Sequence, residues 1–84
     1  MLYILRFHPS VKKDLANIPD QDYIRIKKVL SSLESDPFLG KKLWGEYKGY
    51  YSIRVWPYRI VYTLHRTSQS IIITAIGYRQ GIYK

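Results

Sequence analysis

The residues best suited to chemistry in this sequence are three arginines, Arg54, Arg59 and Arg79, followed by Tyr83. A planar guanidinium group donates two parallel hydrogen bonds, a geometry that suits a phosphodiester. Cleavage of RNA by its own 2′-hydroxyl needs a base, an acid and stabilisation of developing negative charge. The arginines could stabilise that charge. Tyr83 could act as a base or orient a nucleotide, since nearby cations favour the phenolate. The sequence does not decide which group is the base and which the acid.

Positive charge is concentrated in the second half of the chain. The net charge is +8, and residues 41–84 contain a single acid, Glu46, to pair with their lysines and arginines. A solubilising surface would explain the charge alone, but a polyanion is the more natural partner of such a region. Nucleic acid is favoured over membrane because no Lys/Arg-rich amphipathic helix accompanies the charge. The residues predicted to contact RNA are Lys41, Lys42, Lys48, Ser52, Tyr78 and Lys84.

Composition excludes several kinds of site. The chain has no cysteine, so disulfides and thiolate zinc sites are impossible, and its two histidines, His8 and His65, are scattered. We therefore expect no cofactor, no metal and a structural role for both histidines. No apolar run reaches the length of a membrane span or of a signal peptide, which favours a cytoplasmic protein. A chain of 84 residues fits one domain, 1–84.

The first half of the chain predicts a strand and two helices. Residues 2–7 are rich in β-branched and aromatic side chains and stop before Pro9, which indicates a strand. Ser10 is a candidate N-cap for a short helix that ends before Pro19. Asp20 is a candidate N-cap for a longer helix that ends at residues 36–37, Asp-Pro. Its predicted apolar stripe consists of Tyr23, Ile26, Val29, Leu30 and Leu33.

The second half changes to the two-residue period of strands. We expect strands at about 43–47, 50–56, 58–65 and 71–78, joined by turns too short for parallel crossovers. Alternation places Tyr51 and Tyr62 on the face that packs against the helices, and Arg54 and Arg59 on the other face. Residues 71–73, all isoleucine, suit a central strand. The predicted fold is α+β, with two helices packed on an antiparallel, meander-like sheet that begins with the N-terminal strand.

Four segments of the chain resemble the core pattern of RelE-type toxins within the RelE/ParE toxin superfamily. The family pattern runs roughly as K-L-x-G, G-Y-Y-R-I-R-V, Y-R-I-x-Y and I-G-H-R-x-x-x-Y. The matching residues are 42–45 (KLWG), 49–55 (GYYSIRV), 58–62 (YRIVY) and 76–83 (IGYRQGIY). The resemblance implies that Arg54, Arg59 and Arg79 bind and polarise the scissile phosphate. It further implies that Tyr83 orients the substrate nucleotide.

The resemblance also implies an activity and partners. RelE relatives are toxins of type II toxin–antitoxin pairs that cleave mRNA in the ribosomal A site without a metal. The expected partners are therefore mRNA, the ribosome and an acidic antitoxin encoded beside the toxin, in a heterodimer or heterotetramer. Two positions depart from the pattern: Ser52 replaces a cation and Tyr78 replaces a histidine. These departures leave open two alternatives, a ParE-like inhibitor of DNA gyrase and an inactive homologue that only binds a partner.

Overall fold

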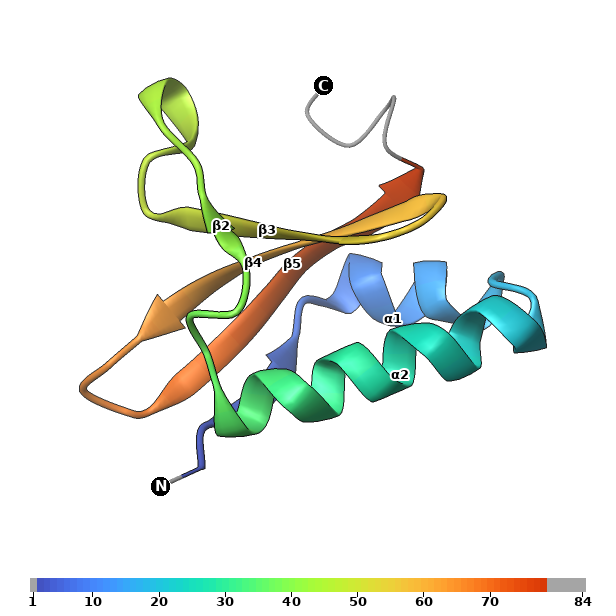
Figure 1. The fold of residues 1–84 in the computed structure, drawn as a ribbon, viewed down its shortest axis with the longest axis horizontal. Helices are drawn as coiled ribbons and strands as arrows, with labels where there is room; N and C mark the ends of the chain where they lie inside the picture. The colour runs from blue at the N-terminus through green and yellow to red at the C-terminus, as the bar shows by residue number, and fades with distance from the viewer. Residues whose placement is uncertain (1, 79–84) are drawn as a thin grey trace.

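The computed structural model describes residues 2–78 of the chain. Those residues form two α-helices, one 3-10 helix and one five-stranded sheet (Figure 1). The elements occur in the order β1 (Ile4–Phe7), α1 (Pro9–Ala16), α2 (Asp20–Ser35), β2 (Lys41–Lys42), η1 (Gly45–Tyr47), β3 (Tyr50–Val55), β4 (Tyr58–His65) and β5 (Ser70–Tyr78).

The sheet has the strand order β1-β5-β4-β3-β2. Strands β2 to β5 pair antiparallel with their neighbours along the chain, which confirms the predicted meander. Strand β1 pairs in parallel with β5, so the sheet as a whole is mixed. This pairing makes β5 an internal strand, as the isoleucine run at 71–73 predicted.

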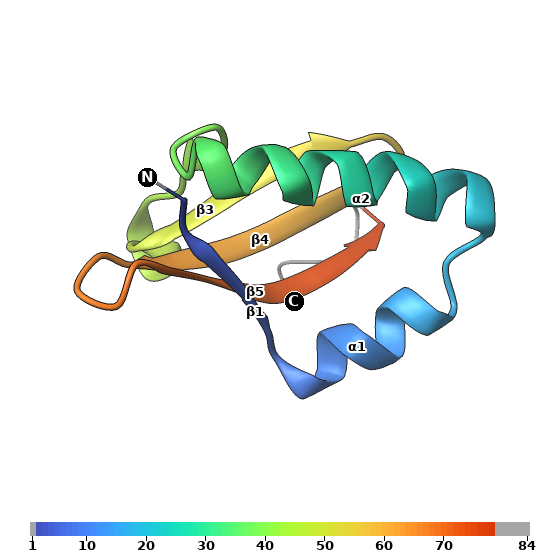
Figure 2. The same cartoon turned by 90° about the horizontal axis from the view of Figure 1, so that it is seen from below.

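Both helices lie on the same face of the sheet (Figure 2). Helix α2 presents Ile26, Leu30 and Leu33 to that face, one turn apart, because apolar residues recur at helical spacing. We call this side of the sheet the helix-covered face. Its buried sheet residues are Tyr51, Val55, Tyr58, Ile60, Tyr62, Ile71, Ile73 and Ile76. Complete burial of one such side chain contributes about 1.5–3 kcal/mol, so this contact is the main source of stability.

The other side of the sheet, which neither helix covers, is called the open face here. It carries Lys41, Ser52, Arg54, Arg59, Val61 and Gly77, because these positions alternate with the residues of the helix-covered face in the strand register.

A β-bulge in β5 changes which residues reach each face. Val61 pairs with Ala75 but Tyr62 pairs with Ile73, so Thr74 is the extra residue. The Thr74 hydroxyl donates a hydrogen bond to the Val61 carbonyl, 3.1 Å away. Beyond the bulge the alternation is reversed, and Tyr78 pairs with Tyr58 on the helix-covered face.

Three sequence predictions about the first strand and the two helices were wrong. The first strand begins at Ile4 rather than residue 2. Helix α1 begins at Pro9, and its N-cap is His8, whose Nδ1 accepts a hydrogen bond from the Ser10 amide at 3.2 Å. Asp20 is the first residue of α2 rather than its N-cap, and with Asp22 it places negative charge at the positive end of the helix dipole.

The largest correction concerns the predicted strand at 43–47. Strand β2 is limited to Lys41 and Lys42, and a 3-10 helix occupies Gly45–Tyr47. Gly45 adopts a positive φ of 69°, a conformation that ends a strand and that glycine adopts without steric cost. Within residues 2–78, no helix is long and apolar enough to cross a membrane.

Candidate functional site

Two rows of paired residues cross the open face. In the first row Arg54 on β3 pairs with Arg59 on β4, and Arg59 pairs in turn with Gly77 on β5. In the second row Lys41 on β2 pairs with Ser52, and Ser52 pairs with Val61. Directly paired side chains on one face lie within about 5.5 Å of each other at Cβ. The sheet register therefore brings the predicted site residues Lys41, Ser52, Arg54 and Arg59 together.

These residues line one hollow of about 300 Å³, with Leu43 as its apolar wall. This volume is at the lower end of the range for small-ligand pockets. Arg54 and Lys41 are exposed, Arg59 is half-buried, and Ser52 is buried at 5% exposure, so the cations surround a polar floor. Among the residues described, the Ser52 hydroxyl oxygen is buried without a hydrogen-bond partner. Such an arrangement is suited to holding an anion.

The position of Lys41 depends on a buried tyrosine of the helix-covered face. The Tyr62 hydroxyl donates to the Pro37 carbonyl at 2.9 Å and accepts from the Gly40 amide at 2.9 Å. Burial raises the pKa of Tyr62, so its hydroxyl remains a donor. These two hydrogen bonds fix the segment that leads into β2 and so fix the start of the cationic hollow.

A second hollow, of about 480 Å³, continues from the first toward η1. It shares Lys41, Leu43 and Arg59 with the first hollow, and its remaining lining residues are Lys42, Trp44 and Tyr47. Sequence analysis did not single out Trp44 as a site residue. The available signal was the tryptophan in the KLWG segment, an apolar aromatic residue beside cations in a region that carries most of the charge.

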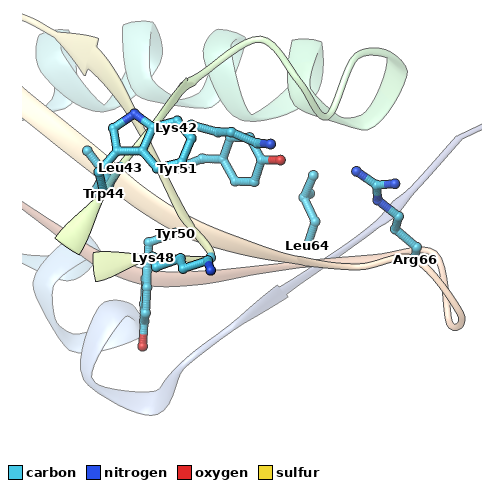
Figure 3. A pocket seen from close by; sticks show the side chains of 9 residues that line it. Lys42, Leu43, Trp44, Lys48, Tyr50, Tyr51, Leu64 and Arg66 are labelled. Atoms are coloured by element: carbon cyan, nitrogen blue, oxygen red, sulfur yellow. The ribbon is translucent and has the colours of Figure 1, made fainter. Parts of the chain in front are cut away.

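Lys48 does not line the hollow that contains Arg54. It lies at another hollow beside β3, which Lys42, Tyr50, Tyr51, Leu64 and Arg66 also line (Figure 3). Arg66 projects over the Phe38 ring at 5.2 Å, and Phe38 packs edge-on against Tyr51. This hollow therefore reaches the helix-covered face, and the predicted RNA contact Lys48 is separated from the arginine pair. Lys42 and Trp44 line this hollow and also the second hollow, which contains Arg59.

Tyr78 also lies apart from the arginine pair. Its ring stacks on Tyr58, with centroids 5.0 Å apart, and the Tyr58 hydroxyl donates to Asp22 on α2 at 3.3 Å. Burial, together with the adjacent Tyr78 and Asp22, raises the pKa of Tyr58 to about 12. Arg25 pairs with Asp22 at 2.7 Å and donates to the Trp56 carbonyl at 2.7 Å. This cluster joins α2 to the β3–β4 hairpin that carries Arg54 and Arg59.

Three predicted site residues, Arg79, Tyr83 and Lys84, lie outside the described residues. Within residues 2–78, no group of three or more His, Cys, Asp or Glu side chains is arranged to hold a metal ion. His8 caps α1 and His65 lies 3.4 Å from the Thr63 hydroxyl, so neither contributes to the cationic hollow.

Comparison with known proteins gives the same fold and a family. Residues 5–83 match the family described as ParE toxin of the type II toxin–antitoxin system. The chain is 27% identical over 86 residues to toxin RelG of Mycobacterium tuberculosis, covering all of this chain and 99% of that protein. It is 29% identical over 89 residues to the RelE1 protein of Methanocaldococcus jannaschii, covering 100% of this chain and 98% of that protein.

Solved structures agree with these relatives. The toxin–antitoxin complex RelBE2 of M. tuberculosis contains a chain that superposes with a TM-score of 0.86 at 25% identity, covering 94% of this chain and 100% of that one. The isolated E. coli RelE toxin superposes with a TM-score of 0.81 at 23% identity, covering 90% and 83% of the two chains, and supports the fold alone. The protein belongs to the RelE/ParE superfamily of type II toxins, in its RelE-like branch.

Proposed function

We propose that this toxin is a metal-independent endoribonuclease that cleaves mRNA in the ribosomal A site and so inhibits translation. The observation that carries the proposal is the hollow on the open face, in which Arg54, Arg59 and Lys41 surround a buried serine. The lining residues of that hollow within residues 2–78 include three cations and no carboxylate, a composition that suits an anion of the substrate. The likeness to the RelE-like branch supports RNA as that substrate.

In this proposal the described cations bind the scissile phosphate and stabilise the charge that develops on it. Arg54 and Arg59 would do so from adjacent strands, since their direct pairing lets both approach one phosphate. Lys41 would add a third positive charge from β2. The resemblance assigns Arg79 to the same phosphate and Tyr83 to the nucleotide. The positive charge of residues 41–84 is the reason to expect Lys84 at the RNA as well. Ser52 stands in place of a further cation, so proton transfer in this enzyme would be slow.

The test is cleavage of ribosome-bound mRNA, read by toeprinting in a reconstituted translation reaction. We expect the wild-type chain to cut the mRNA and Arg59→Ala to lose activity by about a hundredfold or more, the effect of removing one charge-stabilising donor. Lys28→Ala is the matched control, because it removes one positive charge from the exposed side of α2. Intact mRNA in the wild-type reaction would overturn the proposal.

A second candidate function, inhibition of DNA gyrase, is favoured by the family match, which is to the ParE toxin. A gyrase supercoiling assay with the same protein preparation distinguishes the two activities. We expect supercoiling to continue at toxin concentrations that arrest translation. Loss of supercoiling together with intact mRNA would support gyrase inhibition and contradict mRNA cleavage.

We also propose a partner, an acidic antitoxin encoded next to this toxin. RelBE2 is a complex of toxin and antitoxin, and this chain matches one of its chains over that chain's full length. The charge of residues 41–84 would speed the association of an acidic partner, and apolar contacts would supply most of the affinity. Co-expression with the neighbouring reading frame should relieve toxicity and yield a heterodimer or heterotetramer in the cytoplasm. Unrelieved toxicity without a complex would contradict this proposal.

A further inference from the structure

Trp44 is the most exposed large apolar residue of residues 2–78, with 73% of its surface accessible. It lines the hollow that also contains Lys41, Tyr47 and Arg59. A tryptophan in a folded protein ordinarily buries most of its large apolar surface, so an exposed indole beside cations in a hollow points to a ligand.

The backbone around Trp44 is held in place on both sides. Before it, the Leu43 amide donates to the Tyr50 carbonyl at 3.0 Å, which extends the pairing of β2 with β3. After it, Gly45 turns the chain with a positive φ, and the Tyr47 amide donates to the Trp44 carbonyl at 3.3 Å. Trp44 therefore projects from a defined turn (Figure 3), and a ligand that contacts it does not have to order a loose loop.

The two adjoining hollows have complementary chemistry. Arg54 lies in the first and Trp44 with Tyr47 in the second, and Arg59, Lys41 and Leu43 line both. A nucleotide of single-stranded RNA has the same division, with a charged phosphate at one end and an aromatic base at the other. Bases of single strands are held by stacking on aromatic side chains beside cationic groups.

We propose that Trp44 is a base-stacking residue, with Tyr47 beside it, for the nucleotide adjacent to the phosphate held by Arg54 and Arg59. This inference rests on the proposed function, because it assumes that the cationic hollow binds RNA. Stacking is tolerant of sequence, since every base has a π-face, so Trp44 would contribute affinity more than sequence preference.

The chain allows a direct test because it contains only two tryptophans, Trp44 and Trp56. In the Trp56→Phe variant, Trp44 is the sole indole. The probe is a short single-stranded oligoribonucleotide made uncleavable by 2′-O-methyl groups, so that binding is measured independently of catalysis. We expect saturating oligonucleotide to quench Trp44 emission, whereas inorganic polyphosphate, which has charge but no bases, should leave it unchanged.

The matched variant Trp44→Phe retains Trp56, which lies on the β3–β4 hairpin and whose backbone carbonyl is held by Arg25. Its emission should not respond to the oligonucleotide. Trp44→Ala should weaken oligonucleotide binding about tenfold or more, and Trp44→Phe should weaken it much less because a ring is retained. Circular dichroism of both variants checks that the fold is kept.

The outcomes separate this inference from the proposed function. If Arg54→Ala weakens oligonucleotide binding but Trp44→Ala does not, and Trp44 emission is unchanged, RNA binds the cationic hollow and the stacking site is wrong. If neither substitution changes binding, the inference and the proposed RNA site both fail. If polyphosphate quenches Trp44 emission as strongly as the oligonucleotide does, the stacking site is also wrong, because the quenching then does not require a base.

Discussion

The two faces of this sheet are built from alternate residues of the same strands, yet they have opposite properties. On β4, Ile60 is fully buried under the helices, whereas the preceding residue, Arg59, lines the cationic hollow. The helix-covered face is largely apolar, and the hydroxyls of its Tyr58 and Tyr62 are hydrogen-bonded. The open face holds cations around a hollow whose lining residues within 2–78 include no carboxylate. Substitutions on the open face can therefore change its chemistry while the helix-covered face continues to determine the fold.

The largest effect on stability should come from a cavity in the helix-covered face. Ile60→Ala removes a completely buried side chain from the centre of β4, and we expect the free energy of unfolding to fall by about 2–5 kcal/mol. Urea denaturation followed by circular dichroism measures this change. A fall in the free energy of unfolding below about 0.5 kcal/mol would contradict the conclusion that the helix-covered face is the main source of stability.

A smaller loss should follow from Gly40→Ala, where the two faces are linked. A Cβ on Gly40 would lie 2.6 Å from the Tyr62 hydroxyl and 3.0 Å from the Ser52 carbonyl. Because that hydroxyl is held by two hydrogen bonds, the added methyl should overpack the site and cost about 1–3 kcal/mol.

Gly77→Ala is the matched control for this substitution, because a Cβ there meets no atom of residues 2–78 within 4 Å. Thermal unfolding of both variants should show a lowered Tm for Gly40→Ala only. A normal Tm for Gly40→Ala would show that the segment before β2 can shift without cost.

Tyr58 should make stability depend on pH in the alkaline range. Its pKa in the folded protein, about 12, is above the ordinary value of 10.0, so the folded state retains a proton that the unfolded state has lost. The stability that the protonated Tyr58 contributes to the folded state is therefore fully present below pH 10 and is lost as pH rises from 10 to 12. Denaturant midpoints of wild type and Tyr58→Phe should converge over this interval. If the midpoints of the two proteins differ by the same amount at every pH, the raised pKa of Tyr58 is contradicted.

The smallest effect on stability, and a large one on activity, should come from Arg54→Ala. Its side chain is exposed on the open face, so we expect the free energy of unfolding to change by no more than about 0.5 kcal/mol. Cleavage of ribosome-bound mRNA should fall by about a hundredfold. Full activity in this variant would show that Arg54 is not part of the proposed site. A large loss of stability would show that the open face also determines the fold.

The elements and the site were predictable to different degrees. The two helices, strands β3 to β5 and the shared face of Arg54 and Arg59 followed from local periodicity, because burial of one face imposes its spacing on the sequence. The strand expected at 43–47 was wrong because Gly45 was not recognised as a turn residue. Trp44 was missed because an exposed aromatic residue in a predicted strand resembles any half-buried one.

The sequence by itself determined the fold class, the family and the residues of the arginine pair, since these depend on hydrophobic spacing and on matched segments. The tertiary structure decided three further features. It placed β1 parallel to β5, a pairing between distant segments that no local pattern specifies. It placed Trp44 in a hollow with Arg59. It also moved Tyr78 to the face opposite the arginines, because a bulge of one residue at Thr74 reverses the alternation of every side chain beyond it.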